Sequence, residues 1–273
     1  MALDPASVRS DSSQLEAYGF YFALTRSAPV PAAIDSGGEP NLGGTLVYVG
    51  ELDAHGRALA IAGNVAGCAT LAATADVAAQ RQSIRDGVVD FLVTSLDEAL
   101  RILKNEIRQR KTVAVAVSVA PGIVEREMHE RGVQPHLVFA GLPGQQRNVQ
   151  DFGMGSCKIQ LTEPDPGLAS LTWEVAHSPA RWMPKLDAVV VECFASDSWE
   201  RRWFRLSPRY LGRTALAQRA LFCDPQVAKE IVSRIADLVR GGEIGAEVSA
   251  SLVIGGDSTV FRILPSATRE RNS

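Results

Sequence analysis

The segment from Gly63 to Thr70 holds the residues most suited to binding a small molecule. It follows the β-prone residues 58–62 and precedes a proline-free stretch rich in helix formers, so it predicts a strand-to-helix turn. A helix N-terminus presents unpaired backbone N–H groups, which bind anions. The run does not fit G-x-G-x-x-G, and a tight turn without a ligand explains it equally well. The candidate cofactor-binding residues are Gly63, Asn64, Gly67, Cys68 and Thr70.

Cysteine placement bears on two kinds of chemistry. Cys68 lies near the expected helix start, where a thiol pKa can be lowered, although a buried packing cysteine is the commoner case. The four cysteines are widely separated, and no two form a C-x-x-C pair. We therefore expect reduced thiols, with neither a disulfide framework nor a zinc knuckle.

Arginines and aromatic residues concentrate in one region near the end of the chain. Such a patch can clamp a phosphate or carboxylate, or form a dimer seam. A solvated helix face paired with local acids is the favoured interpretation. The arginines are Arg201, Arg202, Arg205, Arg209, Arg213 and Arg219, and the aromatic residues are Trp199, Trp203, Phe204 and Tyr210.

No catalytic constellation emerges from the remaining polar residues. The four histidines are isolated, and no two have the i, i+3 or i, i+4 spacing of a helical metal pair. The aspartates and glutamates form no discernible catalytic pair. We therefore predict no metal site and identify no catalytic residue.

Strand and helix patterns alternate along the first half of the chain. Residues 45–49 and 58–62 read as strands separated by the turn-like residues 53–56, and residues 67–85 read as a helix. Ser95 and Glu98 form a capping-box pattern that predicts a helix over residues 96–110. The continuously apolar residues 112–119 are typical of a central parallel strand. This alternation indicates right-handed βαβ crossovers and a mainly parallel sheet with helices on both faces.

The second half predicts a long loop, then further strands and a helix. Residues 141–167 are rich in Gly, Pro and Gln, and could form a lid over a site. We expect strands at 168–176 and 187–194, a capped helix at 224–240 and a C-terminal β-hairpin, with strands at 248–254 and 259–264. Residues 1–43 read as an extension that packs through its apolar patch at 18–24, and residues 44–273 as a single domain.

Composition limits the classes of function. The apolar share of 46% and the charged share of 22% are ordinary for a globular protein. A net charge of −3 gives no overall positive field for nucleic acid or anionic lipid. The start lacks the apolar core of a secretory signal, and no apolar run is long enough to span a bilayer. We expect a cytoplasmic protein that binds neither nucleic acid nor membrane.

Three stretches resemble the central NAD-binding domain of the urocanase (urocanate hydratase) family. Residues 63–73 align without a gap on the family's run Gly-Gly-Met-Gly-Gly-Ala-Gln-Pro-Leu-Ala-Ala, with agreement at Gly63, Gly67 and residues 71–73. Residues 86–100 resemble its Gly-Tyr-Leu-Asp and Leu-Asp-Glu-Ala-Leu motifs, and residues 131–135 its Arg-Gly-Val-Arg-Pro. The order and spacing of all three agree. The match covers roughly Arg57 to Leu137, and we expect residues 44–273 to form a Rossmann-like α/β domain.

The departures from the family bear on function. Asn64 and Ala66 replace glycines that let the backbone approach a pyrophosphate. The interval 74–85 is too short to hold a helix end, a turn and the family's second strand with its ribose-binding acid. The family's catalytic cysteine lies in another domain, so no cysteine here inherits that role. The resemblance therefore implies a nucleotide or other small anionic ligand, NAD first among the cofactors, and a homodimer.

Two classes of function stay open at this point. If the chain is an enzyme, the resemblance points to a hydro-lyase or an NAD-dependent reaction. The alternative is a non-catalytic regulatory or assembly protein that has lost cofactor binding. The ligand-binding interpretation and the kinship with the family both depend on Gly63 and Gly67 forming a strand-to-helix turn, and another kind of element there would contradict both.

Overall fold

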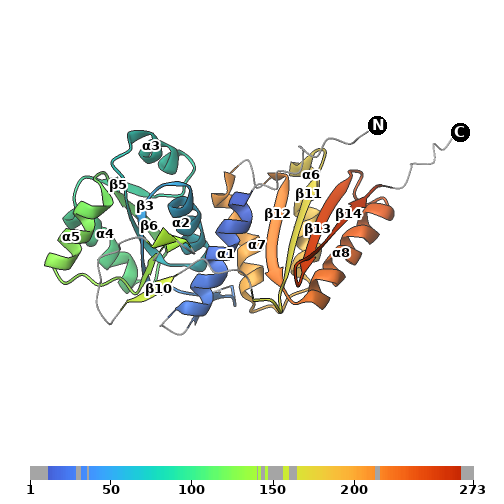
Figure 1. Cartoon of the computed structure of the whole chain (residues 1–273), viewed down its shortest axis with the longest axis horizontal. Helices are drawn as coiled ribbons and strands as arrows, with labels where there is room; N and C mark the ends of the chain where they lie inside the picture. Colours follow the sequence, from blue (N-terminus) through green and yellow to red (C-terminus); the bar gives the residue numbers. More distant parts are fainter. Residues whose placement is uncertain are drawn as a thin grey trace, which may run out of the picture. The chain divides into compact units, whose positions relative to one another are not determined.

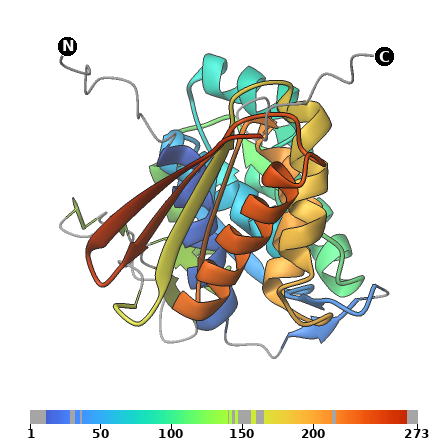
Figure 2. The same cartoon turned by 90° about the vertical axis from the view of Figure 1, so that its right-hand side faces the viewer.

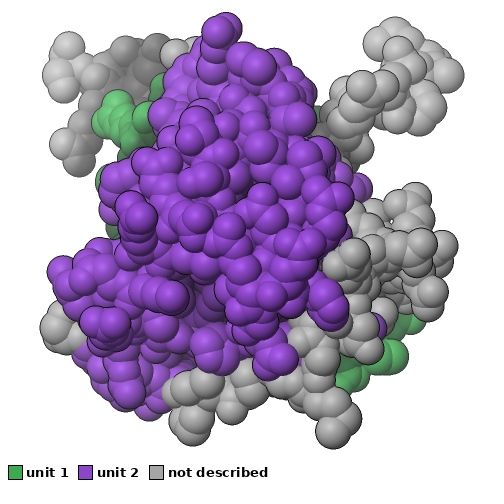
Figure 3. All heavy atoms as spheres, turned by 90° about the vertical axis from the view of Figure 1, so that its left-hand side faces the viewer, with its two compact units in different colours: residues 1–18, 164–193, 213–273 green, residues 19–163, 194–212 purple. Residues whose placement is uncertain are grey.

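The computed structural model describes residues 12–28, 32–35, 37–139, 141–142, 145–146, 156–159, 165–212 and 216–265. The chain forms two compact units (Figure 3). Unit 1 comprises residues 1–18, 164–193 and 213–273, and unit 2 comprises residues 19–163 and 194–212. Each has a sheet of its own (Figure 1).

Unit 2 is built around a parallel sheet of six strands in the order β10-β7-β3-β4-β6-β5. The central strands β3, β4 and β6 are almost entirely buried, which explains their continuous apolar sequence. The parallel register pairs Leu71 of β4 with Tyr48 of β3 and Val115 of β6. The strands are β3 (Leu46–Glu51), β4 (Ala69–Ala73), β5 (Phe91–Val93), β6 (Val113–Val117), β7 (Leu137–Phe139) and β10 (Cys157–Ile159).

Helices cover both faces of this sheet, as the sequence predicts (Figure 1). Helices α4 (Leu96–Arg108) and α5 (Pro121–Glu130) share a core with Tyr48, Leu71 and Val115. Helix α2 (Ala54–Ala66) lies over the other face, because its Gly63 abuts Thr70, whose side chain points opposite to that of Leu71. Helix α3 (Val77–Arg85) connects β4 to β5.

Ser95 of the predicted capping box is confirmed as the N-cap of α4. The Glu98 backbone N–H donates to Ser95 Oγ at 3.3 Å, and α4 ends at Arg108, close to the predicted boundary. The predicted central strand at 112–119 is also confirmed, as β6.

The predicted strand at 58–62 is wrong, because these residues lie inside α2. Asp53 is the N-cap of this helix, and Gly67 ends it in the left-handed conformation, with φ of 92°. Ten of its thirteen residues are buried, so the helix has no polar face to reveal a 3.6-residue period. The residues expected to begin a helix at position 67 instead form strand β4.

The remaining elements of unit 2 lie near the ends of its sequence ranges. Helix α1 (Ser12–Ser27) buries Phe20, Tyr21 and Leu24, which confirms packing through the apolar patch of the expected extension. Part of the expected loop at 141–167 is ordered as β10, and most of the rest lies outside the described residues. The other elements are β1 (Ala33–Ile34), β2 (Pro40–Asn41), β8 (Gly141–Leu142), β9 (Gln145–Gln146) and α7 (Trp199–Tyr210).

Unit 1 contains an antiparallel sheet of four strands in the order β12-β11-β13-β14 (Figure 2). The C-terminal hairpin is confirmed, with Ile254 paired to Asp257 across Gly255 and Gly256. Both glycines have positive φ, which a two-residue hairpin turn of this kind requires. The strands are β11 (Ala169–Val175), β12 (Gln218–Cys223), β13 (Val248–Ile254) and β14 (Asp257–Ile263).

Two helices, α6 (Pro179–Val191) and α8 (Pro225–Arg240), pack on this sheet. The α8 prediction is confirmed, with Asp224 as its N-cap. The predicted strand at 187–194 is wrong, because its β-branched residues belong to the end of α6. Met183, Leu186 and Val190 are buried at helical spacing, so packing overrides the strand propensity of the valines.

The two sheets also bear on the expected domain boundaries. A single domain over residues 44–273 was expected, whereas the parallel sheet ends at Ile159 and every strand from Ala169 onward belongs to the antiparallel sheet. Inserted in sequence between parts of unit 1, residues 194–212 join unit 2.

A close backbone approach fixes α2 against the end of β3. A Cβ atom on Gly56 would lie 1.8 Å from the carbonyl oxygen of Glu51 and 3.1 Å from Val49 Cγ1. The distance to the Glu51 oxygen is too short for any side chain, so residue 56 must be glycine.

We predict that Gly56→Ala lowers the free energy of unfolding by about 3 kcal/mol, because the added methyl group meets backbone that cannot move aside. Gly122→Ala is the matched control, since Gly122 also lies in the first turn of a helix and nothing lies within 4 Å of its added Cβ. The control should change stability by no more than about 1 kcal/mol. Urea denaturation measures both, and equal stabilities would show that the approach at Gly56 is not a constraint.

Candidate functional site

The five predicted cofactor-binding residues do not lie at a helix N-terminus. Gly63 and Asn64 are in the last turns of α2, and Gly67 is its C-cap. Cys68 follows, and Thr70 is in β4. The C-terminal end of a helix presents carbonyl oxygens and a partial negative charge, which is the wrong sign for an anion. The predicted geometry of an anion site at these residues is therefore wrong.

Packing explains why these residue types occur at these positions. Thr70 Oγ1 would lie 2.8 Å from a Cβ on Gly63, so glycine makes room for the threonine. The Asn64 side-chain amide donates to the carbonyl of Val88 at 2.8 Å. Gly67 adopts a positive φ, and a Cβ there would also press on Arg202. The sequence motif marks a helix end sealed inside unit 2.

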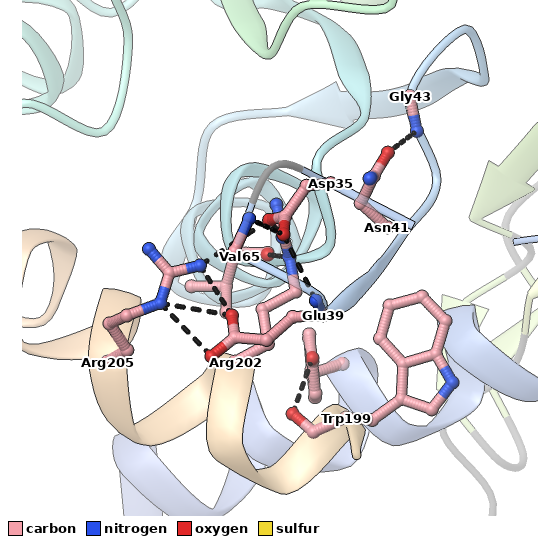
Figure 4. A network of polar contacts seen from close by, with 10 residues as sticks. Asp35, Glu39, Asn41, Gly43, Val65, Trp199, Arg202 and Arg205 are labelled. Carbon is pink, nitrogen blue, oxygen red and sulfur yellow. Dashed lines mark hydrogen bonds and ion pairs between the residues drawn. The ribbon is translucent and has the colours of Figure 1, made fainter. Parts of the chain in front are cut away.

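Arg202 of α7 closes the C-terminal end of α2 (Figure 4). Its Nε donates to the carbonyl of Val65 at 2.6 Å, and its Nη1 lies 2.6 Å from Asp35 Oδ2. The next arginine on this face, Arg205, pairs with Glu39. The Arg202 side chain is only 7% exposed, so this is an internal contact rather than a clamp open to a ligand.

The carboxylate of Asp35 is held in its charged form within this network. Burial alone would raise its pKa, but the backbone N–H groups of Glu39 and Gly37 and the guanidinium of Arg202 together lower the pKa below its usual value. The favoured interpretation of the arginine cluster, pairing with local acids, therefore holds for Arg202 and Arg205, although Arg202 is buried.

The other arginines of the cluster have separate roles. In unit 1, Arg219 pairs with Asp187 of α6 at 2.6 Å, and both side chains are largely buried. Burial raises the pKa of Asp187, and Arg219 offsets part of that effect. Arg201 donates to the carbonyl of Phe194 at 3.0 Å. Arg213 lies outside the described residues.

Cys68 lacks the two properties of an activated thiol, which are exposure to solvent and a lowered pKa. It is fully buried, and burial raises its pKa to about 12, with Arg202 only partly opposing the shift. The packing interpretation of this cysteine therefore agrees with the structure.

The crevice that α/β sheets of this topology use lies at the carboxyl ends of the strands. From β3 the chain passes through α2 to β4 on one side, whereas β7 has β10 as its neighbour on the other side. Ligands bind where the connections that leave two adjacent parallel strands run toward opposite edges of the sheet. This rule places the candidate site of unit 2 around the end of β3, at the turn from β3 into α2.

The β3–α2 turn runs from Gly50 to Gly56. Gly50 has φ of 79° and lies where the pairing with β4 shifts register. The Asp53 carboxylate accepts the Gly56 N–H at 2.8 Å and caps α2. The Glu51 carboxylate accepts the N–H of Leu52 at 3.2 Å. Two glycines thus frame a turn that carries two acidic side chains.

The end of β4 contributes a third acidic residue. Asp76 is exposed, caps α3 by accepting the Ala78 N–H at 2.8 Å, and follows Gly56 by 20 positions. Dinucleotide-binding sheets carry the ribose-binding acid at this place. The expected lack of a second strand followed by an acidic residue is wrong, because that strand is β4 at residues 69–73, before the interval 74–85.

Sequence reasoning missed Asp53, Gly56 and Asp76, although signals for them are present. Asp53 follows the predicted strand at 45–49 and is an N-cap residue type with a glycine three positions on. Interpreting residues 53–56 as the start of a helix would have placed the first strand-to-helix turn after residues 45–49 instead of at residues 63–70. Asp76 would then have followed the second strand.

The fold and this edge define unit 2 as a Rossmann-like unit, the architecture of nucleotide-binding domains. Residues 30–140 match the family model of the urocanase Rossmann-like domain. The resemblance to that domain is thus confirmed for unit 2, although the pairing of residues 63–70 with a ligand-binding glycine loop is not supported by their positions. The match ends before the antiparallel sheet of unit 1.

The described part of the chain was also compared with what a metal centre and a membrane span require. Among those residues, no three His, Cys, Asp or Glu side chains gather in a way that could hold a metal ion. None of the helices described is both long and apolar enough to cross a membrane.

The residues at the ends of β3 and β4 suit the ribose of NAD better than its pyrophosphate. Asp76 stands where a ribose would be held, and Gly56 gives the close packing of helix on strand that the fold requires. The turn, however, has Glu51 and Asp53 where a pyrophosphate would meet glycine backbone and free N–H groups. The ribose of NAD therefore fits this edge better than its pyrophosphate does.

We predict that Cys68 does not react with Ellman's reagent in the native protein, because at pH 8 a thiol with a pKa of about 12 is ionised in only about one molecule in 10⁴. Cys157 is exposed, so Cys157→Ser should remove the fastest reacting thiol. Cys68→Ser should leave that phase unchanged. Loss of the fast phase in Cys68→Ser would contradict the buried position of this residue.

Proposed function

We propose that unit 2 binds a small molecule that carries a ribose, at the carboxyl ends of β3 and β4. The observation that carries this proposal is the position of Asp76, an exposed carboxylate at the end of the second strand of a Rossmann-like sheet. A carboxylate has about four acceptor positions, and capping α3 uses one oxygen. Acceptor capacity thus remains for the two adjacent hydroxyls of a ribose.

The surroundings of Asp76 support a preformed site. Thr74 is buried, its carbonyl accepts the side-chain amide of Gln80 at 2.8 Å, and its hydroxyl accepts the Asp76 N–H at 3.2 Å. Thr74 also donates its N–H to Val117 of β6 at 3.1 Å. The loop that holds Asp76 is therefore tied to the sheet, and the carboxylate needs little reorganisation to bind.

The match to the urocanase Rossmann-like domain supports the nucleotide class of ligand, with NAD as one member of it. We assign no catalytic step to this edge. A cytoplasmic location and a homodimer stay predictions.

A second candidate function is a non-catalytic regulatory or assembly protein that has lost the cofactor. Asp53 favours it, because its carboxylate occupies the N-terminus of α2 that would otherwise bind phosphate. A panel of ligands separates the two candidates. A ribose-binding protein gains thermal stability with at least one ribose-bearing compound, whereas the second candidate responds to none.

We predict that Asp76→Asn weakens binding of the ribose-bearing ligand about tenfold, because a charge-assisted hydrogen bond is replaced by a neutral one. Adenosine, AMP, ADP and NAD are the probes, and isothermal titration calorimetry gives the dissociation constants. Asparagine caps a helix as well as aspartate does, so the fold is kept.

Asp224→Asn is the matched control, because Asp224 likewise caps a helix but belongs to unit 1. It should leave the affinity unchanged. Equal affinity in the wild type and in Asp76→Asn, or no binding of any probe, would contradict the proposed function.

A further inference from the structure

We infer that the β3–α2 turn excludes phosphate groups, so that unit 2 selects a nucleoside over nucleotides and over NAD. This inference rests on the proposed function and names the ligand class at the same site. It comes from the juxtaposition of three carboxylates with the helix N-terminus at the carboxyl ends of β3 and β4.

The first step concerns the backbone donors at the start of α2. An anion binds a helix N-terminus through N–H groups of the first turn. Here the Asp53 carboxylate accepts the Gly56 N–H at 2.8 Å. Asp53 thus supplies the negative charge that the helix dipole favours, and it takes a donor that a phosphate oxygen would need.

The second step concerns the charge around this position. Glu51 is paired in register with Ala73, so the ends of β3 and β4 bring Glu51 and Asp53 to the same edge as Asp76. The described residues between each of strands β3 to β6 and the helix after it contain no lysine or arginine. The nearest arginine in sequence, Arg57, is engaged with Asp86 at 2.6 Å and Ser83 at 2.9 Å. None of these described segments therefore supplies a lysine or arginine to a pyrophosphate.

The third step concerns shape. The carbonyl oxygen of Glu51 would lie only 1.8 Å from a Cβ on Gly56, so helix and turn are in direct backbone contact. This contact fixes the turn, and with it the carboxylates of Glu51 and Asp53, at the start of α2. Uncharged hydroxyl groups, in contrast, can donate to the carboxylates at the rim of this edge.

The inference is tested by comparing ligands that share adenosine and differ in phosphate. Calorimetry on the full-length protein is expected to show that ADP and NAD bind at least about tenfold more weakly than adenosine, because like charges are brought together. This difference should narrow when NaCl is raised from about 0.05 M to about 0.5 M, since salt screens exposed charges.

The variant Asp53→Ser separates charge from structure. Serine is as good an N-cap as aspartate, so α2 keeps its start while the charge is removed. Combined with Glu51→Gln, it should raise the affinity for NAD about tenfold and leave that for adenosine within about twofold. Thermal unfolding of the variant verifies that it is folded.

The outcomes distinguish this inference from the proposed function. If wild-type protein binds NAD as tightly as adenosine, or if the variant gains nothing for NAD, the exclusion of phosphate is wrong and ribose binding stands. If neither compound binds to wild type or variant, the proposed function fails and the inference fails with it.

Discussion

The backbone contact between Gly56 and the carbonyl of Glu51 is the constraint on which the site of unit 2 depends. It sets α2 directly on the end of β3 and so fixes where the first turn of that helix begins. Asp53 then falls at the N-cap and Glu51 at the last position of the strand. Both the close packing of α2 on β3 and the position of these two carboxylates at the end of β3 follow from this one approach.

The C-terminal end of α2 is held by different contacts. Arg202 donates to the Val65 carbonyl there, and the Leu42 N–H donates to that of Ala66 at 2.8 Å. These bonds satisfy carbonyls that a helix end leaves unpaired. The buried arginine is in turn neutralised by Asp35, so α7 and residues 35–42 act together as a seal on this end of the helix.

Much of the fold could be predicted from the sequence where local signals agree with the tertiary structure. The Ser95 N-cap of α4, the apolar run of β6, the N-cap of α8 and the Gly255–Gly256 hairpin all lie where their patterns indicate. The strands predicted at 58–62 and 187–194 are both helices. A run of alanine and valine in a buried helix has no polar residues at regular spacing. Its hydrophobic pattern therefore does not distinguish a helix from a strand.

The site was harder to predict than the fold for a related reason. When residues of α2 are assigned to a strand, its C-cap Gly67 is interpreted as the start of a phosphate-binding loop, and the residues of β4 are assigned to a helix. The β3–α2 turn and Asp76 are then no longer recognised as lying after the ends of strands. The family resemblance survives this error, because the match extends over residues 30–140 and does not depend on one glycine run.

The account is tested most directly by amide hydrogen exchange in the presence and absence of adenosine. It predicts slower exchange in residues 50–57 and 74–80, at the ends of β3 and β4, and unchanged exchange in residues 63–70. Protection confined to residues 63–70, or none in either β-strand end, would contradict the placement of the site at the β3–α2 turn.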